Sequence, residues 1–361
     1  GDTRPLRWWG RPLDEYLDSG LRVSPLQGWV EWIGHPRPES WLKEKTSKKN
    51  GWRRVAAAAG LDQILGPAIR SDLQLPGWPE LALSSHAEGR FREVFTGYRF
   101  DDIAVQFLTA YDNPPGGEDD DGSWHRYDLD RVRIGSLELD IASDAPGLAT
   151  VAYAERLDCN GRPLPVIPNS AGPTRMLQKF AFGPGTTRVR PLQALGARHL
   201  EVRLATRGRS AITRAVFRER DTLGPPTGAL SLDDPLLERV WRVGLDTMRS
   251  SAEDSVVDSV RERGEWLGDL SSVGCELAAV GWGSTTHLRR ALLHAAAGAR
   301  ADGLVAGCGP GELLYLGTFA AQWILGCVRC AELEGSTAVL DQLEQPASRN
   351  MQALLDCLEP D

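Results

Sequence analysis

The sequence RERGEWLGD, residues 261–269, places three carboxylates, two arginines, a tryptophan and two glycines within nine positions. A fourth carboxylate, Asp258, lies just before it. Enzymes that cleave glycosidic bonds need such side chains, because one carboxylic acid protonates the leaving oxygen, a second carboxylate acts nearby, and an aromatic ring offers a face to the sugar. One helical pattern precedes the segment and another follows it. We therefore expect the segment to line a cavity.

The composition is that of an ordinary globular protein. The chain has 361 residues, of which 42% are hydrophobic and 25% charged, and this predicts two or three domains. The net charge of −8 argues against a nucleic-acid partner, because a phosphate-binding surface needs a basic excess. No apolar run approaches the roughly 18 residues of a membrane-spanning helix, so we expect no membrane partner. Gly1 opens the sequence without a recognisable leader, which leaves cytoplasmic, periplasmic and secreted locations open.

The cysteines and acidic runs predict neither a metal nor a cofactor. Six cysteines are too few for a disulfide scaffold. Cys327 and Cys330 form a CxxC pair inside the apolar helical run WILGCVRCAEL, which favours a core helix over a redox or zinc site. The acidic run Glu118–Asp121 lacks spaced ligands, and we interpret it as a solvated hairpin tip rather than a calcium site.

The first two thirds of the chain are predicted to be β structure. Residues 1–90 alternate Trp, Pro, Gly and charge, which indicates an irregular N-terminal β module. Eight of the twelve tryptophans fall within the first 124 residues; we interpret most as core anchors, with sugar stacking as the alternative. Residues 91–225 predict a β-sandwich, because turn signals separate short runs rich in β-branched and aromatic residues. These runs are FREVFTGYRF, IAVQFLTAYD, RVRIGSLELDI, LATVAYAERLD, RVRPL, HLEVRLAT and AITRAVFRER.

Residues 226–361 are predicted to be helical. The punctuation GPPTG at residues 224–228 marks the change, and Asp234 is the expected N-cap of a helix that begins at Pro235. Apolar residues at helical spacing predict further helices over residues 265–280, 286–298, 316–334 and 347–358. The short connections are typical of stacked helical hairpins. The fold class is therefore multidomain, β followed by α.

The order of these features resembles the inverting α-L-rhamnosidases, which are six-hairpin (α/α)6-barrel glycoside hydrolases. Their motif, D-C-P-x-R-E-x-x-x-W-x-G-D, is matched in spacing from Arg261 and Glu262 through Trp266 to Gly268 and Asp269. YAERLDCNGRP and FGPGTTRVRPLQALGARHLEVRL resemble the sandwich that precedes the barrel, and ARADGLVAGCGPGE and FAAQWILG resemble later barrel hairpins. The resemblance covers about residues 95–361. It implies a β-sandwich, the first part of an (α/α)6 barrel, and hydrolysis of terminal α-L-rhamnosyl linkages.

The resemblance also implies roles for individual residues. Glu262 falls on the general acid, and Asp258 and Asp269 fall on carboxylates that bind sugar hydroxyls. Trp266 falls on an aromatic residue close to the sugar. The further predicted substrate-binding residues are Arg261 and Trp323, the latter within FAAQWILG.

The residues themselves favour a similar interpretation. On a continuing helix, Glu262, Trp266 and Asp269 would share one face. A carboxyl group beside an apolar ring and other carboxylates has a raised pKa, which a proton donor near neutral pH requires. The alternative is a solvated charge pattern at a helix start. Arg261 and Arg263 would either pair with these acids or meet a carboxylate of the substrate.

Two departures from the motif leave the sugar specificity open. The Cys-Pro of the family is Ser259-Val260 here, and one residue before Arg261 is missing. Where many relatives carry Pro-Asp in a later hairpin, this chain has Gly317-Thr318. A related enzyme with another sugar specificity, including uronate-containing glycans, is therefore one alternative.

The second catalytic carboxylate is not assigned within this chain. An inverting enzyme needs a base about 6.5–9.5 Å from the acid, and in the family a glutamate late in the barrel supplies it. This chain supplies about five of the twelve barrel helices before Asp361. We therefore expect the base to lie outside this chain and a further polypeptide to complete the barrel. The other alternative is a non-catalytic, carbohydrate-binding or degenerate member of the family.

Overall fold

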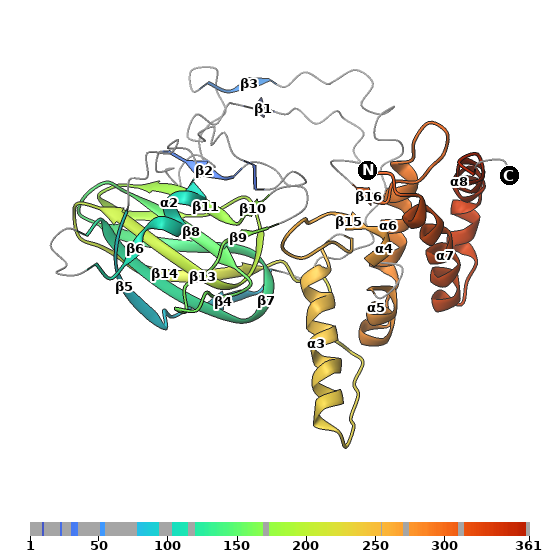
Figure 1. Ribbon diagram of the computed structural model, residues 1–361, viewed down its shortest axis with the longest axis horizontal. Helices are drawn as coiled ribbons and strands as arrows, with labels where there is room; N and C mark the ends of the chain where they lie inside the picture. Colours follow the sequence, from blue (N-terminus) through green and yellow to red (C-terminus); the bar gives the residue numbers. More distant parts are fainter. Residues whose placement is uncertain are drawn as a thin grey trace.

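The computed structural model describes residues 9–10, 22–23, 30–34, 51–54, 78–93, 103–114, 120–168, 173–253, 255–269, 274–309 and 314–358. Most described strands gather in one body, and the helices from α3 onward gather in a second body beside it (Figure 1). In the part of the chain that is described, no helix is long and apolar enough to cross a membrane.

The β body is a large curled sheet, which counts ten of the described strands. Along the main path the strands are β2 (Trp32–Ile33), β11 (Leu177–Phe182), β8 (Gly147–Ala154), β13 (Leu195–Thr206), β7 (Gly122–Ser143), β14 (Ser210–Glu219) and β4 (Glu80–Ala82). Three further strands join it: β12 (Gly185–Val189) and β5 (Ala87–Arg92) pair with β7, and β6 (Tyr111–Asp112) pairs with β5. The pairs are antiparallel except for β2 with β11.

The long strand β7 explains the curl. Its first part pairs with β5 and most of β13, whereas its second part pairs with β14 and β12. Leu137, Leu139 and Ile141 on this second part are fully buried in the main core. The strands predicted over residues 131–141, 148–158, 199–206 and 211–220 lie in β7, β8, β13 and β14, so these predictions are confirmed.

The run IAVQFLTAYD is a correction, because the structure forms helix α2 (Ile103–Thr109) there and only the short strand β6 after it. Its β-branched and aromatic content predicts a strand. However, Ala104, Phe107 and Ala110 recur at a spacing of three, and all three are buried. A helix places this spacing on one face, and that face packs on the sheet. Tertiary packing therefore overrides the local preference for strand.

The described helices after β14 are α3 (Pro235–Ser251), the one-turn α4 (Leu267–Asp269), α5 (Cys275–Trp282), α6 (Thr286–Ala297), α7 (Gly317–Glu334) and α8 (Ala338–Leu355). Asp234 caps α3 as predicted, because its side chain accepts hydrogen bonds from the backbone N–H groups of Leu236 and Leu237. The helices predicted over residues 286–298 and 316–334 are confirmed as α6 and α7.

Two helix predictions need correction. The predicted helix over residues 265–280 is interrupted, because strand β15 (Glu265–Trp266), paired with β16 (Cys308–Gly309), precedes α4 and α5. The last helix begins at Ala338 rather than residue 347. Pro346 lies inside it, whereas a proline normally indicates a boundary. Val339 and Leu343, before the proline, are buried in the helical core and extend the packed face.

The described part of residues 1–90 is joined to the main sheet. Strands β2 and β4 pair with β11 and β14, while β1 (Trp9–Gly10) pairs with β3 (Arg53–Arg54). The buried carboxylate of Glu31 accepts hydrogen bonds from the backbone N–H groups of Leu192 and Gln193 at 3.0 Å. The division at residues 90/91 and 225/226 stays a prediction. Trp8, Trp29 and Trp41 lie outside the described residues.

Candidate functional site

The candidate site is built on the loop from Ala252 to Gly264, which joins α3 to β15 and packs against the β body. Val260 belongs to the core of the main sheet and is 1% exposed. The hydroxyl of Thr174, on β10 (Thr174–Arg175), donates to the backbone oxygen of Arg261 at 3.0 Å. A Cβ at Gly196 would lie 2.4 Å from the backbone oxygen of Ser259, so only glycine allows this approach. The β body therefore fixes the loop that carries the predicted acid.

Asp258 organises the loop around Glu262. Its Oδ1 accepts hydrogen bonds from the backbone N–H groups of Val260, at 3.2 Å, and Glu262, at 3.0 Å. Its own N–H donates to the backbone oxygen of Gly264 at 3.1 Å. Short carboxylate side chains commonly close turns in this way. Asp258 thus holds the backbone of Glu262 in place.

A cavity of about 290 Å³ opens beside this loop. Three of the predicted site residues, Asp258, Trp266 and Asp269, line it. Glu262 is not one of the lining residues; its backbone N–H donates to Asp258, which does line the cavity, and its side chain keeps 17% of its surface exposed. The other described residues that line the cavity are Thr247, Met248, Ser251, Val256, Val257, Ser259, Gly274 and Leu277. The lining therefore combines two carboxylates and an indole with apolar side chains.

Trp266 is held by an edge-to-face contact with Phe319 on α7. The ring centroids lie 6.1 Å apart with an interplanar angle of 88°. A Cβ at Gly268 would lie 2.5 Å from the Phe319 ring, so the glycine of the W-x-G-D motif makes room for this aromatic pair. The indole N–H of Trp266 is buried without a hydrogen-bond partner in the described part of the chain. A buried unpaired donor at a cavity suits a ligand with oxygen acceptors.

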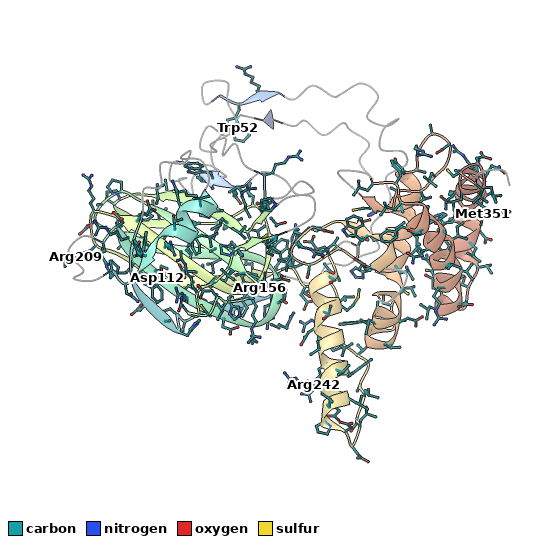
Figure 2. The ribbon with its side chains drawn as sticks, in the orientation of Figure 1. Trp52, Asp112, Arg156, Arg209, Arg242 and Met351 are labelled. Carbon is teal, nitrogen blue, oxygen red and sulfur yellow. The ribbon has the colours of Figure 1, made fainter. Side chains whose placement is uncertain are left out.

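The carboxylates at the cavity influence one another. Partial burial, together with the charges of Asp258 and Glu262, raises the pKa of Asp269. Partial burial and Asp258 raise the pKa of Glu155, which follows strand β8. Arg156, next to Glu155, lies on the side of the β body that faces the helices (Figure 2). The site thus favours the protonated forms of Asp269 and Glu155.

The raised pKa of Asp269 predicts a pH dependence of stability. A carboxyl whose folded pKa lies above its unfolded value contributes stability below the unfolded pKa, and this stability is lost as the pH rises through the folded pKa. Asp269→Asn should therefore match the wild type near about pH 4 and melt at a higher temperature near about pH 7. Thermal melts at both pH values measure this difference.

Asp302 is the matched control of opposite sign. Its pKa is lowered to about 2 by the hydrogen bond from Arg300, with a smaller contribution from the backbone N–H of Leu304. Its stabilisation is present above the unfolded pKa, so Asp302→Asn should lose stability near neutral pH. If the melting temperatures of Asp269→Asn and the wild type depend on pH in the same way, the prediction for Asp269 is contradicted.

The two arginines of the motif have different surroundings. The guanidinium of Arg261 is 49% exposed, with Nε 3.7 Å from Oε1 of Glu262 and Nη2 4.0 Å from Oδ2 of Asp258. Arg263 is 11% exposed and pairs with Glu253 at 2.6 Å. Arg261 is therefore the more exposed of these two arginines. The predicted helical face shared by Glu262, Trp266 and Asp269 is wrong, since residues 261–264 form a loop.

Trp323 does not reach the cavity. Its side chain is 0% exposed in the helical core, and its indole N–H donates to the backbone oxygen of Leu292 at 3.0 Å. A fully buried ring has no face for a sugar, so the structure gives Trp323 a packing role. The predicted core helix around Cys327 and Cys330 is confirmed: both lie buried in α7, and burial raises the pKa of each thiol to about 12.

The described residues contain no group of three or more His, Cys, Asp or Glu side chains placed to hold a metal ion. Residues 115–119, which include the first two residues of the acidic run Glu118–Asp121, lie outside the described part. Asp120, the third residue of the run, pairs with Arg90. The Asp120 side chain is only 10% exposed, and the solvated hairpin tip stays a prediction.

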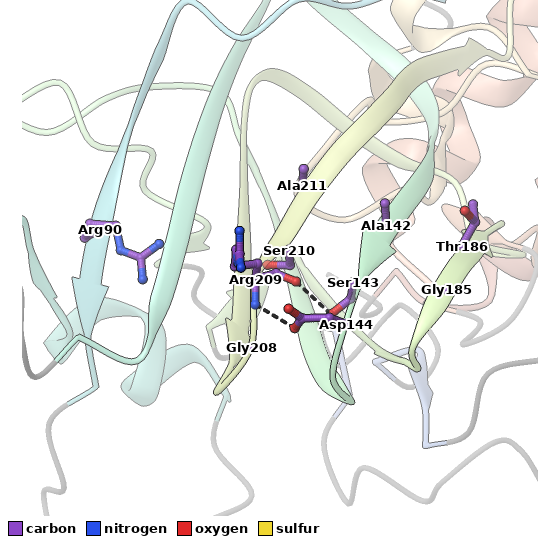
Figure 3. Close-up of a pocket in the computed structure, with 10 residues that line it drawn as sticks. All are labelled: Arg90, Ala142, Ser143, Asp144, Gly185, Thr186, Gly208, Arg209, Ser210 and Ala211. Atoms are coloured by element: carbon purple, nitrogen blue, oxygen red, sulfur yellow. Dashed lines mark hydrogen bonds between the residues drawn. The ribbon is translucent and has the colours of Figure 1, made fainter.

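A second cavity, of about 760 Å³, lies at the tips of β7, β12 and β14 (Figure 3). Its polar groups satisfy one another, because Asp144 accepts from the backbone N–H of Arg209 at 2.8 Å and the Ser143 hydroxyl donates to the backbone oxygen of Ala145 at 2.7 Å. Asp144 is the one carboxylate among its described lining residues, and none of them is aromatic. This cavity therefore offers fewer groups for sugar binding or acid catalysis than the smaller cavity does.

The sequence did not single out three groups of this site. Thr174 and Glu155 reach the loop from the β body, and Met248 and Leu277 form part of the apolar wall. The Glu253–Arg263 ion pair involves the residue that follows Glu262. No local spacing indicates the contacts from the β body, because they join segments about 90 to 110 residues apart.

No family model and no curated protein matches the sequence. Among solved structures, the chain is similar to a rhamnosidase from Klebsiella oxytoca with rhamnose bound, with a TM-score of 0.60, 17% identity, and coverage of 79% of this chain and 58% of that one. It is also similar to the Streptomyces avermitilis α-L-rhamnosidase complexed with L-rhamnose, with a TM-score of 0.59, 18% identity, and coverage of 91% and 29%.

A GH78 family rhamnosidase of Bacillus sp. GL1 gives a TM-score of 0.59 at 17% identity, with coverage of 68% of this chain and 25% of that one. The chain thus spans between a quarter and three fifths of the length of these neighbours. At such low identity the likeness concerns the fold. The chain shares the fold of part of the GH78 α-L-rhamnosidases.

Proposed function

We propose that the chain is the acid-bearing part of a glycoside hydrolase that cleaves terminal α-L-rhamnosyl or related linkages. One observation carries the proposal: Asp258, Trp266 and Asp269 line one cavity next to Glu262, on a fold shared with rhamnosidases. Two of those neighbours hold rhamnose, which supports a carbohydrate ligand.

In the proposed reaction, Glu262 donates its proton to the glycosidic oxygen as the bond between that oxygen and the anomeric carbon breaks. Water attacks the opposite face of the sugar and gives its proton to a carboxylate outside this chain, as inverting hydrolysis requires. Asp258 and Asp269 accept hydrogen bonds from sugar hydroxyls at the cavity, and the Trp266 ring packs against the sugar. No cofactor takes part in this reaction.

The finer architecture belongs to the same proposal. We infer that the curled sheet is a β-sandwich and that α3 to α8 begin an (α/α)6 barrel which a further polypeptide completes. The exposed apolar stripe of α3 supports this inference: Leu236, Val240 and Val243 are 65%, 60% and 56% exposed. They recur at the spacing of a core-facing helical stripe. Figure 1 shows α3 projecting beyond the other helices.

This inference predicts different costs for two faces of α3. Leu236→Ser with Val240→Ser should change the free energy of unfolding by no more than about 0.5 kcal/mol each, because these side chains are exposed, and should reduce self-association. Leu245→Ala, on the buried face, should cost about 2–5 kcal/mol. Urea unfolding and light scattering measure both effects. A serine pair as costly as Leu245→Ala would mean that the stripe already packs within this chain.

The test of the function is hydrolysis of a panel of aryl glycosides by the assembly in which the further polypeptide supplies the base, with an aryl α-L-rhamnoside as the reference, accompanied by calorimetric titration with L-rhamnose. Turnover with a preference for the rhamnoside supports the proposal. Binding without turnover favours a non-catalytic carbohydrate-binding member, an alternative supported by the engagement of Asp258 with its own loop. A preference for an aryl uronide would assign the exposed Arg261 to a substrate carboxylate. Neither binding nor turnover would exclude all three functions.

A further inference from the structure

The residue that follows the proposed acid has an unusual backbone conformation. Arg263 has φ = +52°, in the left-handed region that non-glycine residues with long side chains seldom occupy. The conformation turns the chain back, so that the oxygen of Gly264 accepts a hydrogen bond from the N–H of Asp258 at 3.1 Å. The same Asp258 holds the N–H of Glu262. Strained residues persist only where the surroundings impose them, and they concentrate at functional sites.

The side chain of Arg263 provides that constraint. Its Nη2 donates to Oε2 of Glu253 at 2.6 Å, and Oε1 of the same carboxylate accepts from Nη1 of Arg220 at 2.7 Å. Arg263 and Glu253 keep only 11% and 14% of their side-chain surface exposed. Although burial alone would raise it, the two guanidinium groups hold the pKa of Glu253 below its ordinary value. The carboxylate therefore remains charged between two cations at neutral pH.

Glu253 is itself fixed from several sides. Arg220 directly follows strand β14, and its guanidinium lies 5.0 Å from the centre of the Trp78 ring. The backbone oxygen of Glu253 lies 3.2 Å from Nε2 of His287 on α6, and its N–H donates to the oxygen of Ser255 at 2.8 Å. Glu253 therefore ties the loop to the β body through its carboxylate and to helix α6 through its backbone oxygen.

We propose that Glu253 and Arg263 are positioning residues for Glu262: their ion pair holds Arg263 in the left-handed conformation, and that conformation aims the acid at the cavity. This inference rests on the proposed function for its effect on catalysis. The inferred geometry of residues 262 and 263 is independent of the proposed function.

Glycine at residue 263 separates the roles of backbone and charge, because glycine adopts positive φ without strain. Glu253→Gln and Arg263→Ala should lower kcat for an aryl α-L-rhamnoside by about 10- to 100-fold, the cost of a misplaced catalytic group, with KM changed by less than about twofold. Arg263→Gly should keep most of the activity. The double variant Glu253→Gln with Arg263→Gly should recover the kcat that Glu253→Gln loses.

Glu334→Gln is the matched control, since Glu334 forms an ion pair with Arg289 elsewhere in the helical part. It should lower the melting temperature and leave kcat unchanged. Equal kcat values for Arg263→Ala and Arg263→Gly, or an unchanged kcat in Glu253→Gln, would overturn the inference.

A structural measurement decides the geometry without any turnover. The crystal structure of Glu253→Gln should show residue 263 with negative φ and the Glu262 carboxyl displaced, whereas Arg263→Gly should keep the wild-type path. If the wild type hydrolyses no glycoside, the proposed function fails while this comparison still tests the positioning. An unmoved loop in Glu253→Gln would overturn the positioning, even in an active enzyme.

Discussion

Glu262→Gln is expected to lower the rate of aryl α-L-rhamnoside hydrolysis by about 10²- to 10⁴-fold, the range that general acid catalysis contributes. Glutamine has nearly the same shape as glutamate but carries no acidic proton, so the leaving oxygen departs as an anion. The Glu262 side chain is partly exposed, and its Oε1 lies 3.7 Å from Nε of Arg261. We therefore expect the melting temperature to change little while kcat falls.

The dependence on the leaving group separates a proton donor from a merely structural residue. An activated phenol leaves readily without protonation, so Glu262→Gln should retain more of the wild-type rate on rhamnosides of activated phenols than on those of poor leaving groups. Glu276→Gln, on α5 and paired with Arg329 at 2.6 Å, is a matched carboxylate-to-amide control and should leave both rates unchanged. An equal loss on every aglycone would remove Glu262 from the role of acid.

For the candidate site, the sequence predicts which residues come together but not the conformation of the loop that carries them. The spacing from Arg261 to Asp269 places Asp258, Trp266 and Asp269 at one cavity, but it does not give their geometry. A helical face is the natural expectation for carboxylates seven residues apart. The positive φ of Arg263 and the turn closed by Asp258 produce a loop instead. The turn closes within residues 258–264, and Arg263 pairs with Glu253 outside the motif, but the spacing of the motif indicates neither contact.

The fold also contains elements that the sequence predicts and elements that it does not. The predictions of the strands over residues 131–141 and 199–206 and of helices α6 and α7 are confirmed, because the apolar residues of each pack into a continuous core. Helix α2 was predicted as a strand, since its composition favours strand while its burial follows a helical spacing. Trp323 resembles a substrate-binding residue in sequence, yet its ring fills the helical core. Burial of a single side chain is set by long-range packing.

Buried arginines attach helix α2 to the sheet. Glu201 is 0% exposed and accepts hydrogen bonds from Nε of Arg126 at 2.6 Å and from Nε of Arg203 at 2.8 Å. The guanidinium of Arg203 also donates to the backbone oxygen of Phe107 at 3.1 Å and lies 3.9 Å from the centre of its ring. Both arginines pair in addition with Asp112. The network therefore joins α2 to the sheet through buried charges.

Glu201→Ala should lower the free energy of unfolding by about 3–5 kcal/mol, because it leaves two buried guanidinium groups with only the partly exposed Asp112 as carboxylate partner. Glu80→Ala is the matched control: Glu80 pairs with Arg218 at 2.7 Å but is 48% exposed, so its loss should cost no more than about 1 kcal/mol. Urea unfolding of both variants measures the difference. The double variant Glu201→Leu with Arg203→Met should cost less than Glu201→Ala, because apolar side chains replace a buried ion pair without leaving a charge unpaired. A Glu201→Ala variant no less stable than Glu80→Ala would mean that water reaches the two guanidinium groups, and that apolar packing rather than buried charge holds α2 on the sheet.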